Sequence, residues 1–124
     1  MAILPAVFEE ILFRGVIFNS FNKKYNSFIA IFVSALIFGI YHMNWLQGIF
    51  AFIIGLMLGY VYLKSGSLWV PIILHFINNL IAVLVSHFDA LNFTISTLCA
   101  IYLVISALVV VIFAIYILEM RGKD

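Results

Sequence analysis

Three charged residues lie close together in an otherwise apolar segment near the start of the chain: Glu9, Glu10 and Arg14. An isolated charge in the hydrocarbon core of a bilayer costs at least about 2.5–3.5 kcal/mol, so such residues tend to pair with one another and to mark functional sites. Glu10 and Arg14 are about 40° apart around a helix, in the acid-first order that favours an ion pair. Glu9 lies about 140° from Arg14 on the same helix. We therefore expect Glu10 to pair with Arg14 and Glu9 to face a partner on another helix.

Two further polar groups interrupt later apolar segments. Phe38 and His42 share one face of a helix, and so do His75 and Asn79, because residues four apart lie one turn apart. A carboxylate beside an imidazole can deprotonate a water molecule, which then attacks a carbonyl carbon. A second imidazole and an amide N–H can donate hydrogen bonds to the oxyanion that develops. We expect Phe38 and Phe76 to form part of the apolar wall around these groups.

A zinc site is the alternative use of the same side chains. Glu9, His42 and His75 form a His₂Glu ligand set that leaves an open position for water. Zinc-binding histidines are usually oriented by a second acceptor, and the sequence offers few, because Glu10 is expected to pair with Arg14. We therefore favour a site without a metal or other cofactor. No H-E-x-x-H and no G-x-S-G motif occurs in the sequence.

Composition places the chain in a membrane. The 124 residues are 67% hydrophobic and 9% charged, with a mean hydropathy of +1.28, whereas soluble domains have about 25% charged residues. The few charged residues are spread along the chain, and their net charge is +1. Neither feature indicates a nucleic-acid partner. Cys99 is the only cysteine, which excludes a disulfide within the chain.

The apolar segments predict an all-α fold, a polytopic bundle of about five transmembrane helices in one membrane domain over residues 1–124. Each predicted helix is near the roughly 20 residues that cross a bilayer. We expect a break at residues 87–90 and a C-terminal membrane anchor as the last helix. The expected helices cover about residues 2–19, 27–43, 46–63, 68–86 and 93–118.

Basic residues lie in alternate loops of this arrangement. Lys23 and Lys24 follow the first predicted helix, Lys64 follows the third, and Arg121 and Lys123 lie in the tail. The positive-inside rule then places these loops in the cytoplasm and the N-terminus outside.

Small residues recur along the third predicted helix. Ala51, Gly55 and Gly59 are spaced by four, a pattern that lets two helix backbones approach closely in a membrane. We expect this face to pack against another helix of the same chain rather than to form a dimer seam.

The motifs E-E-x-x-x-R, F-x-x-x-H and H-x-x-x-N, in this order, resemble the CAAX prenyl endopeptidase and bacteriocin-processing family, also called the CPBP or Abi family. The similarity covers about residues 5–82. It implies an all-helical intramembrane endopeptidase with Glu9 as the base. It also implies that His42, His75 and Asn79 complete the catalytic site, with Glu10, Arg14 and Phe38 in support. The family was long regarded as metalloproteases, whereas a metal-free glutamate mechanism is better supported for its eukaryotic branch.

Family proteins usually have several membrane helices before the E-E-x-x-x-R helix, which here begins almost at Met1. The chain is therefore expected to be a fragment, or a minimal member that needs a partner or a homo-oligomer to supply the missing helices. The leading hypothesis is a multi-pass peptidase of the bacterial plasma membrane that cuts a peptide or protein substrate near the bilayer. The alternatives are a non-catalytic bacteriocin self-immunity or scaffold protein that uses the same polar cavity, and an ion or proton pathway.

Overall fold

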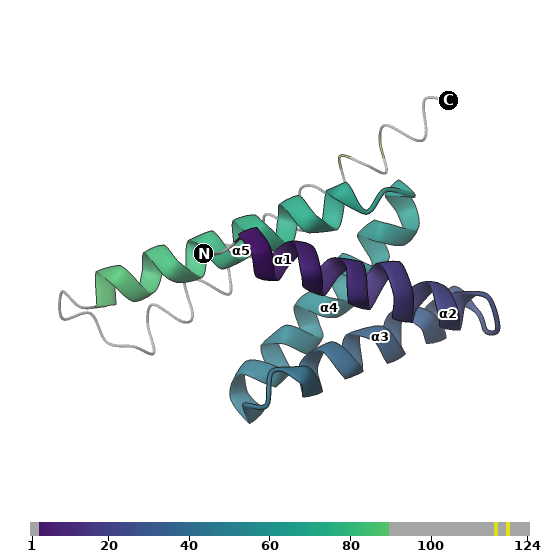
Figure 1. Ribbon diagram of the computed structural model, residues 1–124, viewed down its shortest axis with the longest axis horizontal. Helices are drawn as coiled ribbons and strands as arrows, with labels where there is room; N and C mark the ends of the chain where they lie inside the picture. The colour runs from purple at the N-terminus through teal and green to yellow at the C-terminus, as the bar shows by residue number, and fades with distance from the viewer. Residues whose placement is uncertain (1–2, 90–115, 117–118, 120–124) are drawn as a thin grey trace.

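The computed structural model describes residues 3–89 together with Tyr116 and Glu119. Every element within residues 3–89 is a helix (Figure 1), as the sequence predicts for an all-α fold. The predicted anchor helix over residues 93–118 and Cys99 lie outside the described residues, apart from Tyr116. The elements are α1 (Ile3–Glu10), the π-helix η1 (Ile11–Phe18), α2 (Asn19–Asn22), α3 (Ser27–Tyr41), α4 (Trp45–Ser65) and α5 (Trp69–Asp89).

The first three elements follow one another without a break as one helical rod that ends at Asn22. The sequence predicts an end near residue 19, because residues 19–26 form a mostly polar segment. Instead, the Asn19 side chain donates to the Gly15 carbonyl at 2.9 Å, and the Ser20 hydroxyl donates to the Val16 carbonyl at 2.7 Å. Polar side chains that bond to the preceding turn can remain inside a helix. The π-helical segment in the middle was not predicted, and such segments are frequent at functional sites.

Helices α3 and α4 form an antiparallel hairpin with very close backbone contact. A Cβ atom built at Gly55 would lie 3.1 Å from the Cα of Ala35, and one built at Gly59 would lie 3.3 Å from the Ile31 side chain. The small residues of α4 therefore pack against α3, which confirms the prediction of packing within the chain. The two helices begin at asparagine caps, because the side chain of Asn26 accepts from Ile29 N–H and that of Asn44 accepts from Gln47 N–H.

Gly39→Ala is expected to destabilise the protein by about 1–3 kcal/mol. A methyl group at position 39 would lie 2.8 Å from the Gly48 backbone oxygen on the opposing helix, which no side-chain rotation can relieve. Thermal unfolding in detergent measures the effect. Gly15→Ala is the matched control, because its methyl group would meet only two side chains at 3.8 and 3.9 Å. Equal melting temperatures for the two variants would contradict the close approach of α3 and α4.

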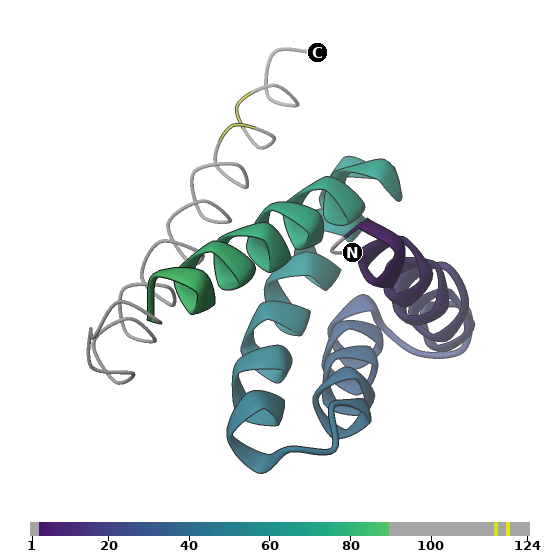
Figure 2. The same ribbon diagram turned by 60° about the vertical axis from the view of Figure 1, so that its left-hand side comes forward.

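Helix α5 lies across α1 and α4 on the side away from the α3–α4 turn (Figure 2). It continues to Asp89, past the predicted end at residue 86 and over residues 87–89 of the predicted break. Residues 87–89 include no glycine or proline, the residues that most often end helices, and the three polar or aromatic side chains alone do not end this one. Pro71 lies in the first turn of α5, where its missing N–H leaves no helical bond unmade.

The described helices have an apolar exterior, and a charged pair lies buried among the apolar side chains of the core. Phe8, Phe28 and Trp45 are 69%, 75% and 82% exposed, whereas Glu10 and Arg14 are completely buried. Among the described residues, α4 is the helix that is long and apolar enough to cross a membrane, with a mean hydropathy of 1.9. Helix α3 and residues 69–84 of α5 are apolar but shorter. The predicted count of five spans is therefore not confirmed.

Candidate active site

The polar residues of the three motifs come from four helical elements that meet near the middle of the bundle. The end of α1 carries Glu9 and Glu10, the π-helix η1 carries Arg14, and His42 is the C-cap of α3. His75 lies in the middle of α5.

Arg14 joins three elements from a fully buried position. Its guanidinium pairs with Glu10 Oε1 at 2.7 Å, and both side chains are 0% exposed. It also donates to the Gly55 carbonyl of α4 at 3.0 Å and lies over the Phe38 ring of α3, 5.1 Å from the ring centroid. The pairing of Glu10 with Arg14 is thus confirmed. The same guanidinium fixes the spacing between η1 and the α3–α4 hairpin.

His75 lies between the two glutamates. Its Nδ1 is 2.8 Å from Glu10 Oε1, and its Nε2 is 3.5 Å from Glu9 Oε2. The expected partner of Glu9 on another helix is therefore His75. The contact of Glu10 with the same ring was not predicted. Consecutive residues point about 100° apart on a helix, but an imidazole has nitrogens on two sides and reaches both carboxylates.

His42 is oriented by the backbone of its own helix. Its Nδ1 lies 2.9 Å from the Phe38 carbonyl. A carbonyl only accepts hydrogen bonds, so Nδ1 is the donor and Nε2 is left for other partners. The Phe38 ring packs edge-on against both histidines, with centroid distances of 4.8 Å to His42 and 5.6 Å to His75. Phe38 therefore holds the spacing between the two imidazoles.

A cavity of about 340 Å³ opens beside these rings, and His42, His75 and Asn79 all line it. Glu9 is not among the lining residues and adjoins the cavity through its contact with His75. Phe38 is part of the wall as predicted. The prediction for Phe76 is wrong, because α4 and Ala82 of α5 supply the remaining apolar side chains. The other lining residues are Asn44, Leu46, Gln47, Phe50, Ala51, Ile54, Asn78 and Ala82.

Three polar lining residues, Asn44, Gln47 and Asn78, were not foreseen from the sequence. The sequence does contain one indication of Gln47: it is an uncharged polar residue near the start of an otherwise apolar helix. Asn78 adjoins Asn79, and both line the cavity although they are consecutive on α5.

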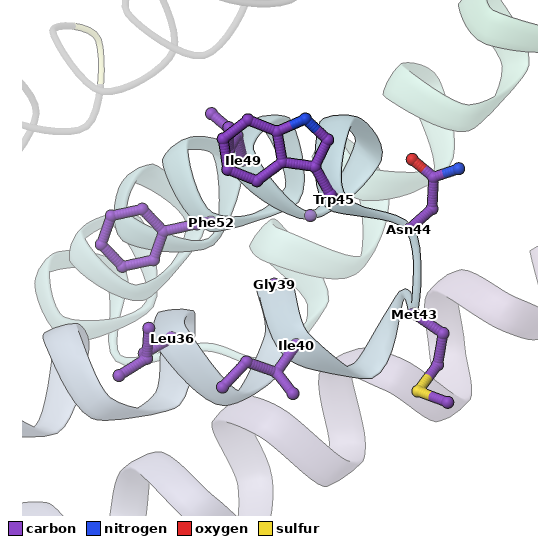
Figure 3. A pocket seen from close by; sticks show the side chains of 9 residues that line it. Leu36, Gly39, Ile40, Met43, Asn44, Trp45, Ile49 and Phe52 are labelled. Atoms are coloured by element: carbon purple, nitrogen blue, oxygen red, sulfur yellow. The ribbon is translucent and has the colours of Figure 1, made fainter.

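A second cavity, of about 360 Å³, lies on another face of the α3–α4 hairpin. Figure 3 shows Trp45, Ile49 and Phe52 of α4 opposite Leu36 and Ile40 of α3. Its lining is apolar except for Asn44 and includes none of the candidate catalytic residues. The candidate catalytic residues His42, His75 and Asn79 therefore line the first cavity and not the second.

The alternative of a zinc site depends on three ligands lying close together. Within the part of the chain that the structure describes, no group of three or more His, Cys, Asp and Glu residues is placed to hold a metal ion. The sequence argument against zinc was nevertheless wrong in one respect. Both histidines have an acceptor at Nδ1, the Phe38 carbonyl for His42 and Glu10 for His75, as metal-binding histidines do.

Comparisons with known proteins identify the family of the chain. Residues 1–81 match the family described as "Type II CAAX prenyl endopeptidase Rce1-like". Over 83 residues the chain is 32% identical to "Putative membrane peptidase YdiL" of Bacillus subtilis (strain 168), an alignment that covers 67% of this chain and 34% of that protein. The chain thus spans about a third of that relative's length. No solved structure matches significantly. The chain belongs to the Rce1-like family of type II CAAX prenyl endopeptidases.

Proposed function

We propose that the chain is an intramembrane endopeptidase that hydrolyses a peptide bond near the bilayer, with a water molecule activated by Glu9. The observation that carries the proposal is the contact of the Glu9 carboxylate with His75, a residue that lines one cavity together with His42 and Asn79. Membership of the Rce1-like family and the likeness to a protein named as a membrane peptidase support it.

The proposed reaction begins when Glu9 takes a proton from water as the water oxygen bonds to the scissile carbonyl carbon. General-base catalysis of this kind contributes about 10²- to 10⁴-fold to a rate. The Asn79 amide donates to the oxyanion that forms, a contact worth about 10²- to 10³-fold in kcat. The C–N bond then breaks, and the proton taken from water passes to the leaving amine. The products are one carboxylic acid and one amine.

The proposal is tested with protein reconstituted in liposomes and mixed with synthetic peptides, with and without a prenylated cysteine. Mass spectrometry should detect pairs of products whose masses add up to one peptide plus one water molecule. His42→Gln should lower the yield of these products, because it removes an imidazole that lines the proposed catalytic cavity. His87→Gln, which changes the third histidine of the chain, should not. Products that form equally with His42→Gln would contradict the proposed site.

Removal of metal ions is expected to leave the rate of hydrolysis unchanged. The described side chains do not gather three metal ligands, and a carboxylate beside an imidazole can activate water without a metal. The rate is compared before and after treatment with a chelator, with the zinc content measured in each sample. Activity lost to the chelator and restored by Zn²⁺ would contradict the proposal and assign Glu9, His42 and His75 as ligands.

The proposed orientation places the loops with Lys23 and Lys64 in the cytoplasm. The Asn19 side chain donates to the Tyr62 hydroxyl at 2.9 Å, so the ends of these two helices lie side by side. In a Cys99→Ser background, Lys23→Cys and Lys64→Cys should resist an impermeant thiol reagent in intact cells. Met43→Cys, at a 92% exposed position in the α3–α4 turn, is the positive control. Labelling at position 23 together with protection at position 43 would show that the orientation is the reverse of the proposed one.

A further inference from the structure

One face of α4 forms a wall of the cavity that holds the candidate catalytic residues, and this wall, all of it within the described residues, contains one polar side chain. The residues of the wall are Leu46, Gln47, Phe50, Ala51 and Ile54. They recur at intervals of three to four, as residues on one helical face do. Among them, Gln47 has a side-chain amide, which can both donate and accept hydrogen bonds. Nothing in the proposed reaction uses this amide.

The side chain of Gln47 is available to a ligand. The residue is exposed, although it lies near the start of an apolar helix. Its hydrogen bond to Asn44 Oδ1, 3.0 Å long, is made by the backbone N–H. Within the described part of the chain, the side-chain amide makes no hydrogen bond. Binding a ligand through this amide therefore breaks no bond that stabilises the described helices.

The backbone of Gln47 is held in place from two directions. Besides the bond from Gln47 N–H to the Asn44 side chain, the N–H of Gly48 donates to the Asn44 carbonyl at 2.6 Å. A Cβ atom built at Gly48 would lie 2.8 Å from the Gly39 backbone oxygen, so α3 touches α4 directly beside Gln47. A binding group on a rigid element loses less conformational freedom when its ligand arrives.

We infer that Gln47 is a substrate-binding residue: its side-chain amide hydrogen-bonds one peptide group of the substrate close to the scissile bond. The inference rests on the proposed function, because it places the substrate in the cavity that His42, His75 and Asn79 line. With about 340 Å³, this cavity is at the small end of the range of ligand pockets, about 300–1,000 Å³, so it holds only a short length of chain.

The chemistry of a peptide group explains why an amide is needed on this wall. A peptide group that enters an apolar cavity leaves its hydrogen-bonding water behind, and it is costly there unless it finds new partners. The other side chains of the α4 wall are apolar and offer none. The Gln47 amide has both the donor that a peptide carbonyl needs and the acceptor that a peptide N–H needs.

Gln47→Leu is expected to raise KM for a cleaved peptide about 3- to 10-fold, the usual net worth of one neutral hydrogen bond, and to leave kcat unchanged. The melting temperature in detergent should also stay the same, because leucine favours a helix as much as glutamine does. Ser20→Ala, which removes a hydroxyl group away from the cavity, is the control and should change neither constant. An unchanged KM in Gln47→Leu, or a lowered kcat at unchanged KM, would overturn the inference.

Ester-containing peptides separate this contact from a general effect of the α4 wall. In each of them one backbone N–H is replaced by oxygen, which removes a donor and weakens the carbonyl of the same peptide group as an acceptor. One ester close to the scissile bond should raise KM with the wild type. The same ester should raise KM less with Gln47→Leu, since the contact is already lost in that protein. Equal effects of every ester on the two proteins would overturn the inference.

Photo-cross-linking tests the contact without relying on peptidase activity. The photoreactive residue p-benzoylphenylalanine is incorporated at position 47 of the Glu9→Gln protein. The control carries it in place of Ile53, at a 49% exposed position of α4 that does not line the cavity. Both proteins are reconstituted in liposomes with the synthetic peptides of the cleavage assay. A peptide should become cross-linked at position 47 and not at position 53.

The two arms distinguish this inference from the proposed function. Cross-linking at position 47 of a peptide that the wild type does not cleave would contradict the proposed peptidase and support the binding role of Gln47. No cross-linking at position 47, or equal cross-linking at positions 47 and 53, would overturn the inference. If the wild type still cleaves the peptides in that case, the proposed peptidase stands.

Discussion

The Glu9→Gln protein is expected to fold normally and to lose about 10²- to 10⁴-fold in kcat, the contribution of a general base. Glutamine matches the size of glutamate but cannot take a proton from water. The Glu9 side chain is 17% exposed, and its polar contact with His75 Nε2 is 3.5 Å long. Little of the folding free energy therefore depends on the charge of Glu9.

The matched control for this prediction is the same substitution one residue further on. Glu10→Gln weakens a buried ion pair with Arg14, so it should lower the melting temperature in detergent, whereas Glu9→Gln should not. Kinetic assays and thermal unfolding are run on the same preparations. A Glu9→Gln protein that keeps wild-type kcat would remove Glu9 from the mechanism.

Arg14→Ala is expected to lower the free energy of unfolding by about 3–5 kcal/mol, the usual cost of leaving one partner of a buried ion pair alone. The change strands the Glu10 carboxylate at a fully buried position and removes the hydrogen bond to the Gly55 carbonyl. It also removes the contact of the guanidinium with the Phe38 ring. The expected readouts are a lower melting temperature in detergent and poor accumulation in the membrane.

A second substitution tests the cause of this loss. Glu10→Gln/Arg14→Met leaves no uncompensated charge, so it should be more stable than either Arg14→Ala or Glu10→Gln alone. If Arg14→Ala unfolds at the wild-type temperature and yet has no peptidase activity, the structural role assigned to Arg14 is wrong.

The sequence predicts the local features of this structure well. The pairing of Glu10 with Arg14 follows from their spacing, because residues four apart meet on any α-helix. The bounds of α3 and α4 lie within two residues of the predicted ones. The glycines of α4 pack against α3 as expected, since small residues at this spacing let helix backbones approach closely.

The features that depend on how helices cross were not predictable in the same way. The contact of Glu10 with His75 joins residues 65 positions apart, and it depends on the position of α5 relative to α1. The apolar wall that α4 contributes, with Phe50 and Ile54, likewise depends on which face of that helix meets the cavity. The apolar pattern of α4 covers most of its surface, so periodicity alone does not identify that face.

The central claim, hydrolysis by a water molecule that Glu9 activates, is tested most directly by a single turnover in H₂¹⁸O. Reconstituted wild-type protein and Glu9→Gln are each mixed with a peptide cleaved in the liposome assay, and the products are analysed by mass spectrometry. The account predicts one ¹⁸O atom in the new C-terminal carboxyl group with the wild type, and product formation about 10²- to 10⁴-fold slower with Glu9→Gln. Equal cleavage by Glu9→Gln, or product from the wild type without ¹⁸O in that carboxyl group, would contradict it.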